Sequence, residues 1–162
     1  MKKTRLLVIT GVFAAMTCGL TFFVRIPTPL GYTHLGDGVI YLAACILPSP
    51  YALLAAAIGG GLADLLAGFP QWVIPTLIIK ALISLPYSSK SVKLLTKRNA
   101  LAVILSGLIT IGGYFWATWF MYDWAAALAE FVGNTVQAVI SGVIFISISI
   151  ALDEIGFKKR IS

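Results

Sequence analysis

Long apolar runs, broken by proline, glycine and charged residues, constrain this chain more than any other feature of its sequence. A bilayer core about 30 Å thick is crossed by a helix of roughly 20 apolar residues, so a chain of 162 residues has room for about six such helices. Composition agrees, because 59% of the residues are hydrophobic and only 11% are charged. Soluble domains typically carry about 25% charged residues. The sequence therefore predicts an all-α integral membrane protein that forms a single domain over residues 1–162.

The breaks divide the chain into six apolar segments, of which the second and the fourth are short. The segments are Leu6–Val24, Asp37–Leu47, Tyr51–Gly68, Trp72–Leu85, Ala100–Tyr122 and Ala125–Leu152. Irregular backbone at membrane depth is tolerated only where it is buried in protein or lines a cavity. We therefore expect a bundle of six transmembrane helices with a cavity near the ends of the two short segments.

The distribution of lysine and arginine predicts how the bundle is oriented in the membrane. Cytoplasmic loops carry an excess of these residues, and ten of the twelve lie near the chain ends or between the fourth and fifth segments. The ten are Lys2, Lys3, Arg5, Lys90, Lys93, Lys97, Arg98, Lys158, Lys159 and Arg160. Both termini are therefore expected in the cytoplasm, with the bundle in the cell (plasma) membrane. The net charge is +6, but the basic residues lie in short clusters between apolar runs and do not form one basic face. This distribution argues against nucleic-acid binding.

Four ionisable residues lie within or at the edge of the apolar segments. Each costs about 2.5–3.5 kcal/mol to insert into a membrane, and therefore requires a partner or a function. The four are Asp37, Asp64, Lys80 and Glu130. Asp64 and Lys80 could form a structural ion pair that joins two helices, or either could contact a ligand, and the spacing leaves both alternatives open.

The fourth segment presents Trp72, Thr76 and Lys80 at steps of four residues. This spacing places an aromatic ring, a hydroxyl and an ammonium group on one helical face. Lys80 would lie roughly 12 Å deeper than Trp72 at about 1.5 Å per residue. The face is expected to line a ligand site that is open to the outside.

The sixth segment repeats this pattern with Glu130, Asn134, Gln137 and Ser141, spaced by four, three and four residues. Such a stripe would also suit a helix that hydrogen-bonds to its neighbours, but it begins at the same outer level as Trp72, which favours a ligand-facing role. In the fifth segment, Tyr114 lies deeper than the tryptophans near the boundary and is the preferred inward-facing ring. Aromatic rings of this kind stack on planar heterocycles.

The first segment carries a different signal, because Gly11, Ala15 and Gly19 form two successive small-xxx-small steps. Small residues at this spacing let two helices approach closely in a membrane. The smooth face could pack within the bundle, or it could be a docking surface for a partner protein.

Motifs for catalysis and for metal binding are absent from the sequence. It contains no phosphate-binding GxxxxGK[ST] loop, no GxSxG elbow and no HExxH helix, and His34 is the only histidine. Polar groups and aromatic rings in apolar surroundings are instead typical of a binding site. We therefore expect a binding protein that is not an enzyme and that holds neither a cofactor nor a metal.

Residues from Arg25 to about Leu82 together carry a family resemblance. The features are LGD after the first segment, a glycine-rich third segment ending in aspartate and a Gly-aromatic turn, and the run W-x-x-P-T-x-x-x-K. The chain thereby resembles the substrate-binding S components of energy-coupling factor (ECF) transporters, in the riboflavin-type group that includes hydroxymethylpyrimidine and pyridoxine carriers. The resemblance implies a small-molecule vitamin-like ligand, and docking on a transmembrane coupling subunit that works with two ATP-binding cassette subunits.

This resemblance, together with the helical phasing, predicts a substrate site and a docking face. We expect His34 and Asp37 to close over or orient the ligand. The predicted walls of the site are Trp72, Thr76, Lys80, Tyr114, Glu130, Asn134 and Gln137, and the predicted docking face is Gly11, Ala15 and Gly19. Two alternatives are a stand-alone proton-coupled secondary transporter that uses Asp64, Lys80 or Glu130, and a membrane enzyme or assembly factor.

Overall fold

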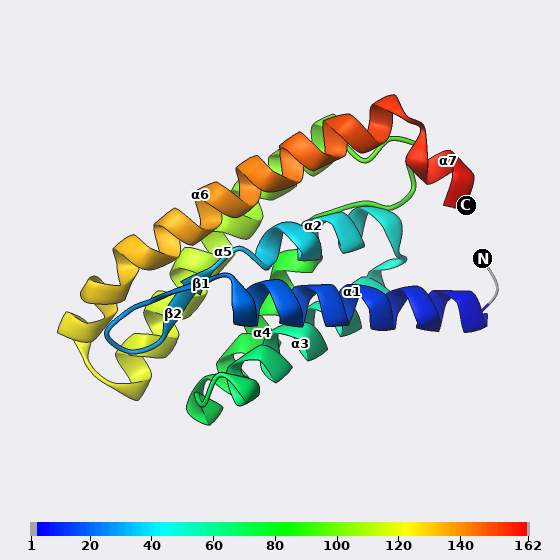
Figure 1. Cartoon of the computed structure of the whole chain (residues 1–162). Coiled ribbons are helices and arrows are strands. Elements are labelled where there is room, and N and C mark those ends of the chain that lie inside the picture. Colours follow the sequence, from blue (N-terminus) through cyan, green and yellow to red (C-terminus); the bar gives the residue numbers. More distant parts are fainter. Residues whose placement is uncertain (1–2, 162) are drawn as a thin grey trace.

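The computed structural model describes residues 3–161, and seven α-helices account for most of them (Figure 1). The helices are α1 (Lys3–Phe23), α2 (Asp37–Ile46), α3 (Ser49–Leu66), α4 (Val73–Ser84), α5 (Lys97–Met121), α6 (Trp124–Glu154) and α7 (Phe157–Ile161). A 3-10 turn, η1 (Pro70–Trp72), precedes α4. Lys2, which the sequence places in a cytoplasmic cluster, lies outside the described residues.

Local sequence signals explain where several helices begin and end. The hydroxyl of Thr96 accepts the Asn99 N–H at the start of α5, and the Asp123 carboxylate accepts the Ala126 N–H at the start of α6. Such caps satisfy backbone donors that have no partner within the helix. Beyond the end of α3 the chain turns at Gly68, where φ is +84°. Residues other than glycine rarely adopt this backbone conformation.

Helices α1 to α6 correspond to the six apolar segments, but they differ in length, and the short helix α7 lies beyond the last segment. Four of the described helices, α1, α3, α5 and α6, are long and apolar enough to cross a membrane, whereas Asp37–Ile46 and Pro70–Ser84 are shorter apolar helices. The number of membrane crossings and the cytoplasmic placement of both termini therefore remain predictions. The mostly helical fold agrees with the sequence.

A short β-hairpin between α1 and α2 departs from the all-helical prediction. Strands β1 (Arg25–Pro27) and β2 (Tyr32–His34) pair antiparallel, with Arg25 opposite His34. The turn between them is closed by the Thr28 N–H, which donates to the Gly31 carbonyl at 3.1 Å. Two prolines in this stretch prevent helix formation, because proline lacks the N–H that a helix interior requires.

Helix α2 lies at the centre of the bundle, and all ten of its residues are buried. It contacts α1, α3, α4 and α6. Its rings and aliphatic side chains form the core with neighbouring helices; Tyr41, for example, stacks on Tyr87 at 5.1 Å between ring centroids. A helix that is apolar on every side is stable only when it is buried, which explains this position.

The outer surface is apolar, as expected for a protein surrounded by lipid. Large hydrophobic side chains on α1, α5 and α6 face outward, including Val8, Leu108, Phe120 and Val139, each at least 60% exposed. Soluble monomers rarely expose contiguous apolar patches of this extent. The surface supports the assignment as a membrane protein.

Helices α1 and α3 approach closely at Gly59. A Cβ atom at this position would lie 2.7 Å from the Ala14 carbonyl oxygen and 2.7 Å from Cβ of Thr17. A residue larger than glycine at position 59 would therefore clash with α1 unless a helix backbone moved.

We predict that Gly59→Ala lowers the midpoint of thermal unfolding in detergent. Overpacking of this kind typically costs about 1–3 kcal/mol. The matched control is Gly112→Ala on α5, where a Cβ meets nothing within 4 Å; it should leave the midpoint unchanged or raise it, since alanine favours helix formation. Equal midpoints for the two variants would contradict the close packing of α1 on α3.

Candidate functional site

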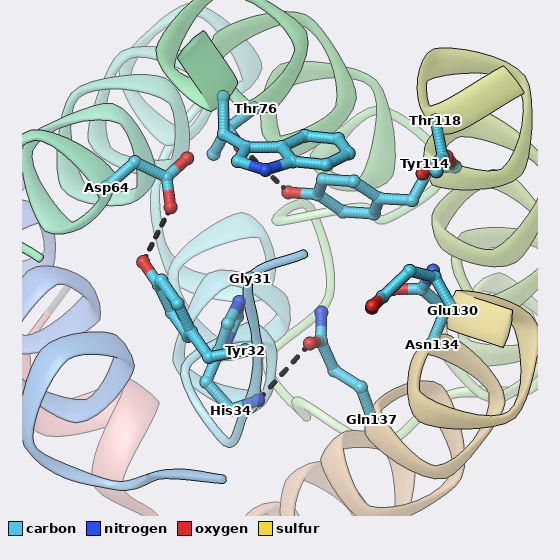
Figure 2. Close-up of a pocket in the computed structure, with 11 residues that line it drawn as sticks. Gly31, Tyr32, His34, Asp64, Thr76, Tyr114, Thr118, Glu130, Asn134 and Gln137 are labelled. Carbon is cyan, nitrogen blue, oxygen red and sulfur yellow. Dashed lines mark hydrogen bonds between the residues drawn. The ribbon is translucent and has the colours of Figure 1, made fainter. Parts of the chain in front are cut away.

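A cavity of about 40 Å³ lies between the hairpin and the helices α3, α4, α5 and α6 (Figure 2). It is lined by Gly31, Tyr32, His34, Asp64, Trp72, Thr76, Tyr114, Thr118, Glu130, Asn134 and Gln137. The hairpin lies toward the opposite end of the molecule from the two termini (Figure 1). The lining combines aromatic rings with convergent polar groups, which is the usual composition of a small-molecule site.

The tip of the hairpin is held by two side chains of the cavity wall. The Leu30 N–H donates to Glu130 Oε1 at 3.1 Å, and the Leu30 carbonyl accepts from Trp72 Nε1 at 2.9 Å. Both backbone groups of Leu30 are thus satisfied by residues more than 40 positions away in the sequence.

Strand β2 is held in the same way, one residue on each side of Thr33. The Tyr32 hydroxyl donates to Asp64 Oδ1 at 2.5 Å, and the His34 N–H donates to Gln137 Oε1 at 3.2 Å (Figure 2). Tyr32 and His34 lie on the cavity side because residues two apart in a strand share a face. The hairpin therefore forms one wall of the cavity.

The two polar stripes predicted on the fourth and sixth segments meet at this cavity. Trp72 and Thr76 lie on one side and Glu130, Asn134 and Gln137 on another. Tyr114 from α5 closes the space between them. Its hydroxyl is 3.0 Å from Thr76 Oγ1, and its ring centroid lies 6.0 Å from that of Trp72.

Lys80, the deepest member of the first stripe, does not line the cavity. Its ammonium group donates to Asp37 Oδ1 at 2.6 Å, and both side chains are fully buried. Asp37 Oδ2 accepts from Gln137 Nε2 at 2.9 Å, so the carboxylate joins α2 to both α4 and α6. The Lys80 ammonium also lies 5.1 Å from the centroid of the Tyr114 ring.

This network corrects two sequence-based predictions. The ion pair expected between Asp64 and Lys80 is wrong, because Lys80 pairs with Asp37 and the Asp64 carboxylate accepts from Tyr32. Asp37 and Lys80 were also expected to contact ligand directly, whereas they lie among the buried groups that do not line the cavity. The physical reason is that Asp37 begins α2, which runs through the centre of the bundle.

The remaining seven predicted substrate residues line the cavity, and a ligand role for them remains a proposal. Sequence reasoning did not assign Gly31, Tyr32 or Thr118 to the site, and it left open whether Asp64 forms an ion pair or contacts a ligand. Thr118 lies one helical turn after Tyr114, so extending that stripe by four residues would have found it. Tyr32 could be found only by recognising a strand.

His34 is buried in the cavity wall as a neutral ring. Its Nδ1 accepts the Gly36 N–H at 3.1 Å, so in the neutral ring the proton lies on Nε2. Burial, together with the nearby Lys80 charge, lowers the pKa of His34 to about 3, although Asp37 opposes the shift. Burial and the neighbouring Asp64 carboxylate likewise raise the pKa of the Tyr32 hydroxyl, which stays protonated and donates.

The predicted docking face of α1 lies on the outside of the bundle. Cβ atoms built at Gly11 and Gly19 would meet nothing within 4 Å, and Ala15 is exposed. The opposite face of α1 is buried, including Thr10 and Thr17. The small residues are therefore not needed for packing among the described helices, and a docking role for them stays a prediction.

Comparisons with known proteins find similarity along most of the chain. A family model described as ECF-type riboflavin transporter, S component, matches residues 1–154. A Pyrococcus woesei protein named "Uncharacterized protein in gap 3'region" is 35% identical over 128 residues, covering 76% of this chain and 84% of that protein. The thiamine precursor transporter HmpT of Lactococcus lactis subsp. cremoris (strain MG1363) is 30% identical over 146 residues, covering 88% of this chain and 84% of that protein.

A solved structure of the S component of a bacterial ECF transporter has a similar fold. The TM-score is 0.76, with 18% sequence identity, over 95% of this chain and 98% of that one. At this level of identity the likeness establishes a shared fold alone.

We predict that Lys80→Met destabilises the protein by about 3–5 kcal/mol, because it leaves the Asp37 carboxylate buried without a counter-charge. The double variant Lys80→Met with Asp37→Asn removes both charges and should recover much of the loss. Chemical unfolding in detergent measures both. If the double variant were as unstable as the single one, the buried charge would not be the cause.

We also predict that His34 makes stability depend on pH in a defined window. The ring stays neutral in the folded protein down to a pKa of about 3 but takes up a proton near pH 6.5 when unfolded. Its contribution is therefore complete above pH 6.5 and is lost as pH falls toward 3, by up to about 1.4 kcal/mol per pH unit.

Unfolding midpoints of the wild type and His34→Asn, measured from pH 7.5 to 5, test this. The difference between the two proteins should shrink as the pH falls. Parallel curves would exclude a neutral buried His34.

Proposed function

Because the chain belongs to the family of ECF-type riboflavin transporter S components, we propose that it is the membrane-embedded substrate-binding subunit of an ECF importer in the plasma membrane. In this proposal it captures a small water-soluble vitamin or vitamin precursor from outside the cell with high affinity. Its substrate is a single-ring heterocycle of the hydroxymethylpyrimidine or pyridoxine type.

The observation that carries the proposal is the composition of the cavity. Trp72 and Tyr114 offer ring faces on which a planar heterocycle can stack, and Asn134 and Gln137 offer amide groups for hydrogen bonds to its edge. The indole of Trp72 is 7% exposed, so its hydrogen bond to Leu30 fixes the ring against the cavity. A lipid or a metal ion would suit this mixture of aromatic and amide groups poorly.

The size of the cavity supports a small substrate. Its volume of about 40 Å³ equals room for about three or four water molecules. A single six-membered ring with short substituents fits this space better than a three-ring flavin, although the family takes its name from riboflavin. The name of the Lactococcus lactis relative, a thiamine precursor transporter, favours the pyrimidine within this class.

Delivery of the substrate requires partners, which we propose to be a transmembrane coupling subunit and two ATP-binding cassette subunits. The outward face of α1 formed by Gly11, Ala15 and Gly19 would dock on the coupling subunit, because a smooth helix face allows close approach in a membrane. The start of α1 and the end of α7 lie toward the end of the molecule that is away from the hairpin (Figure 1). This arrangement favours six crossings with both termini in the cytoplasm and the cavity on the outer side.

Mass spectrometry of the small molecules that survive purification in detergent tests the substrate class directly. We expect hydroxymethylpyrimidine or a compound of similar size to be retained and to be released on denaturation. Uptake by cells that also express the coupling and ATPase subunits should depend on ATP. Uptake without those partners that follows the proton gradient would instead favour a secondary transporter.

We predict that Trp72→Ala weakens binding of hydroxymethylpyrimidine by about tenfold or more, because it removes a stacking face and frees the Leu30 carbonyl from its hydrogen bond. Titration calorimetry in detergent measures the effect. The matched control is Trp116→Ala on the outer surface, where the ring is 52% exposed, and it should bind as the wild type does. Equal affinity of the two variants would remove Trp72 from the site.

A further inference from the structure

The cavity has an unbalanced charge. Two carboxylates, Asp64 and Glu130, line it. Among the residues that the structure describes, no lysine or arginine does so. The nearest candidate, Lys80, is fully buried and is paired with Asp37 rather than with either of these carboxylates.

The other basic groups near the hairpin do not neutralise these carboxylates either. The Arg25 guanidinium lies over the rings of Phe22 and Tyr32, at 4.7 and 5.4 Å from their centroids, and the residue is exposed. His34 is neutral, since burial and the nearby Lys80 charge lower its pKa, and its Nδ1 accepts the Gly36 N–H. A ligand in this cavity therefore meets two carboxylates and, among the described residues, no lysine or arginine that lines the cavity with them.

Asp64 has one oxygen without a partner. Its Oδ1 accepts the Tyr32 hydroxyl at 2.5 Å, whereas its Oδ2 is buried and receives no hydrogen bond. The residue is only 6% exposed, so bulk water does not compensate for the missing bond. A buried unsatisfied acceptor is costly, and a charged one more so.

The Thr76 hydroxyl, which lies beside Asp64 in Figure 2, interacts with the Asp64 carboxylate and is also hydrogen-bonded to the Tyr114 hydroxyl at 3.0 Å, so it is shared between two partners. Glu130 also has one oxygen bonded, by the Leu30 N–H, but it differs from Asp64 because its second oxygen is not a buried atom without a partner. Asp64 is therefore the group in the wall that most needs a donor.

We propose that Asp64 determines substrate specificity by accepting a hydrogen bond from an amino group of the ligand, and that the cavity selects amino-bearing or cationic heterocycles over anionic ones. This inference rests on the proposed function, and it narrows the substrate class to aminopyrimidine-like rings. An exocyclic amine supplies the donor that Oδ2 lacks. A ligand carboxylate or phosphate would face Asp64 and Glu130 across a short gap and would be repelled.

Titration calorimetry of the purified full-length chain tests the proposal with three probes. They are hydroxymethylpyrimidine, its analogue in which hydrogen replaces the amino group, and nicotinate as an anionic ring of similar size. The wild type should bind the amino compound at least about tenfold more tightly than the desamino analogue, as expected for a hydrogen bond to a charged group. It should bind nicotinate more weakly than either.

The decisive variant is Asp64→Asn, which keeps the size of the side chain and an acceptor for the Tyr32 hydroxyl. It should bring the two pyrimidines within about threefold of each other while retaining the affinity for the desamino analogue. The matched control is Asp123→Asn, an exposed helix cap that asparagine can replace; it should keep the wild-type ratio.

The possible failures are distinguishable. An unchanged ratio in Asp64→Asn would overturn the role of Asp64 while leaving the proposed function intact. If the wild type bound nicotinate more tightly than hydroxymethylpyrimidine, the proposed selection against anions would be overturned. This measurement does not require a variant that folds. Retention of an unrelated lipid, with no binding of any ring, would overturn the proposed function itself.

Discussion

The buried pair of Lys80 and Asp37 is the interaction on which the rest of the site depends. Both side chains are fully buried, and the pair joins the central helix α2 to α4. Gln137 extends the pair, because its amide donates to Asp37 and accepts from the His34 backbone. Two charges in an apolar interior are stable only if each is paired and hydrogen-bonded. This network meets the cavity at Gln137, and the loss of one member would leave another buried polar group without its partner.

Above this floor, the side chains that line the cavity also hold the hairpin. Asp64, Glu130, Trp72 and Gln137 each make a hydrogen bond to it and each face the cavity. The position of the hairpin and the shape of the site are consequently coupled. A ligand that competes for one of these side chains alters the support of the hairpin, whereas a ligand that satisfies the remaining acceptor of Asp64 leaves it in place.

The ionisable residues of the apolar segments fall into two groups, those paired with each other and those that line the cavity. Asp37 and Lys80 cancel each other's charge within the structure. Asp64 and Glu130 each have an oxygen that is not used in the contacts to the hairpin, and they lie where a substrate would be. This division places two carboxylates in the cavity wall and leaves Lys80 paired with Asp37 away from it.

By itself, the sequence determined the features that depend on local spacing. Apolar runs predicted the helices and the membrane environment, and steps of three and four residues brought Trp72, Thr76, Glu130 and Asn134 to one cavity, because a helix places such residues on one face whatever surrounds it. The motif from Arg25 to Leu82 indicated the family, which the comparison along residues 1–154 established.

Only the tertiary structure decided which residues are partners. Lys80 and Asp37 are 43 positions apart, and His34 and Gln137 are 103 apart. Helical periodicity orients a side chain around its own axis, but it does not say which neighbouring helix that side chain meets or at what depth. The hairpin was missed for a related reason: its strands are three residues long, and they are stabilised by contacts with the helices around the cavity rather than by their own pattern.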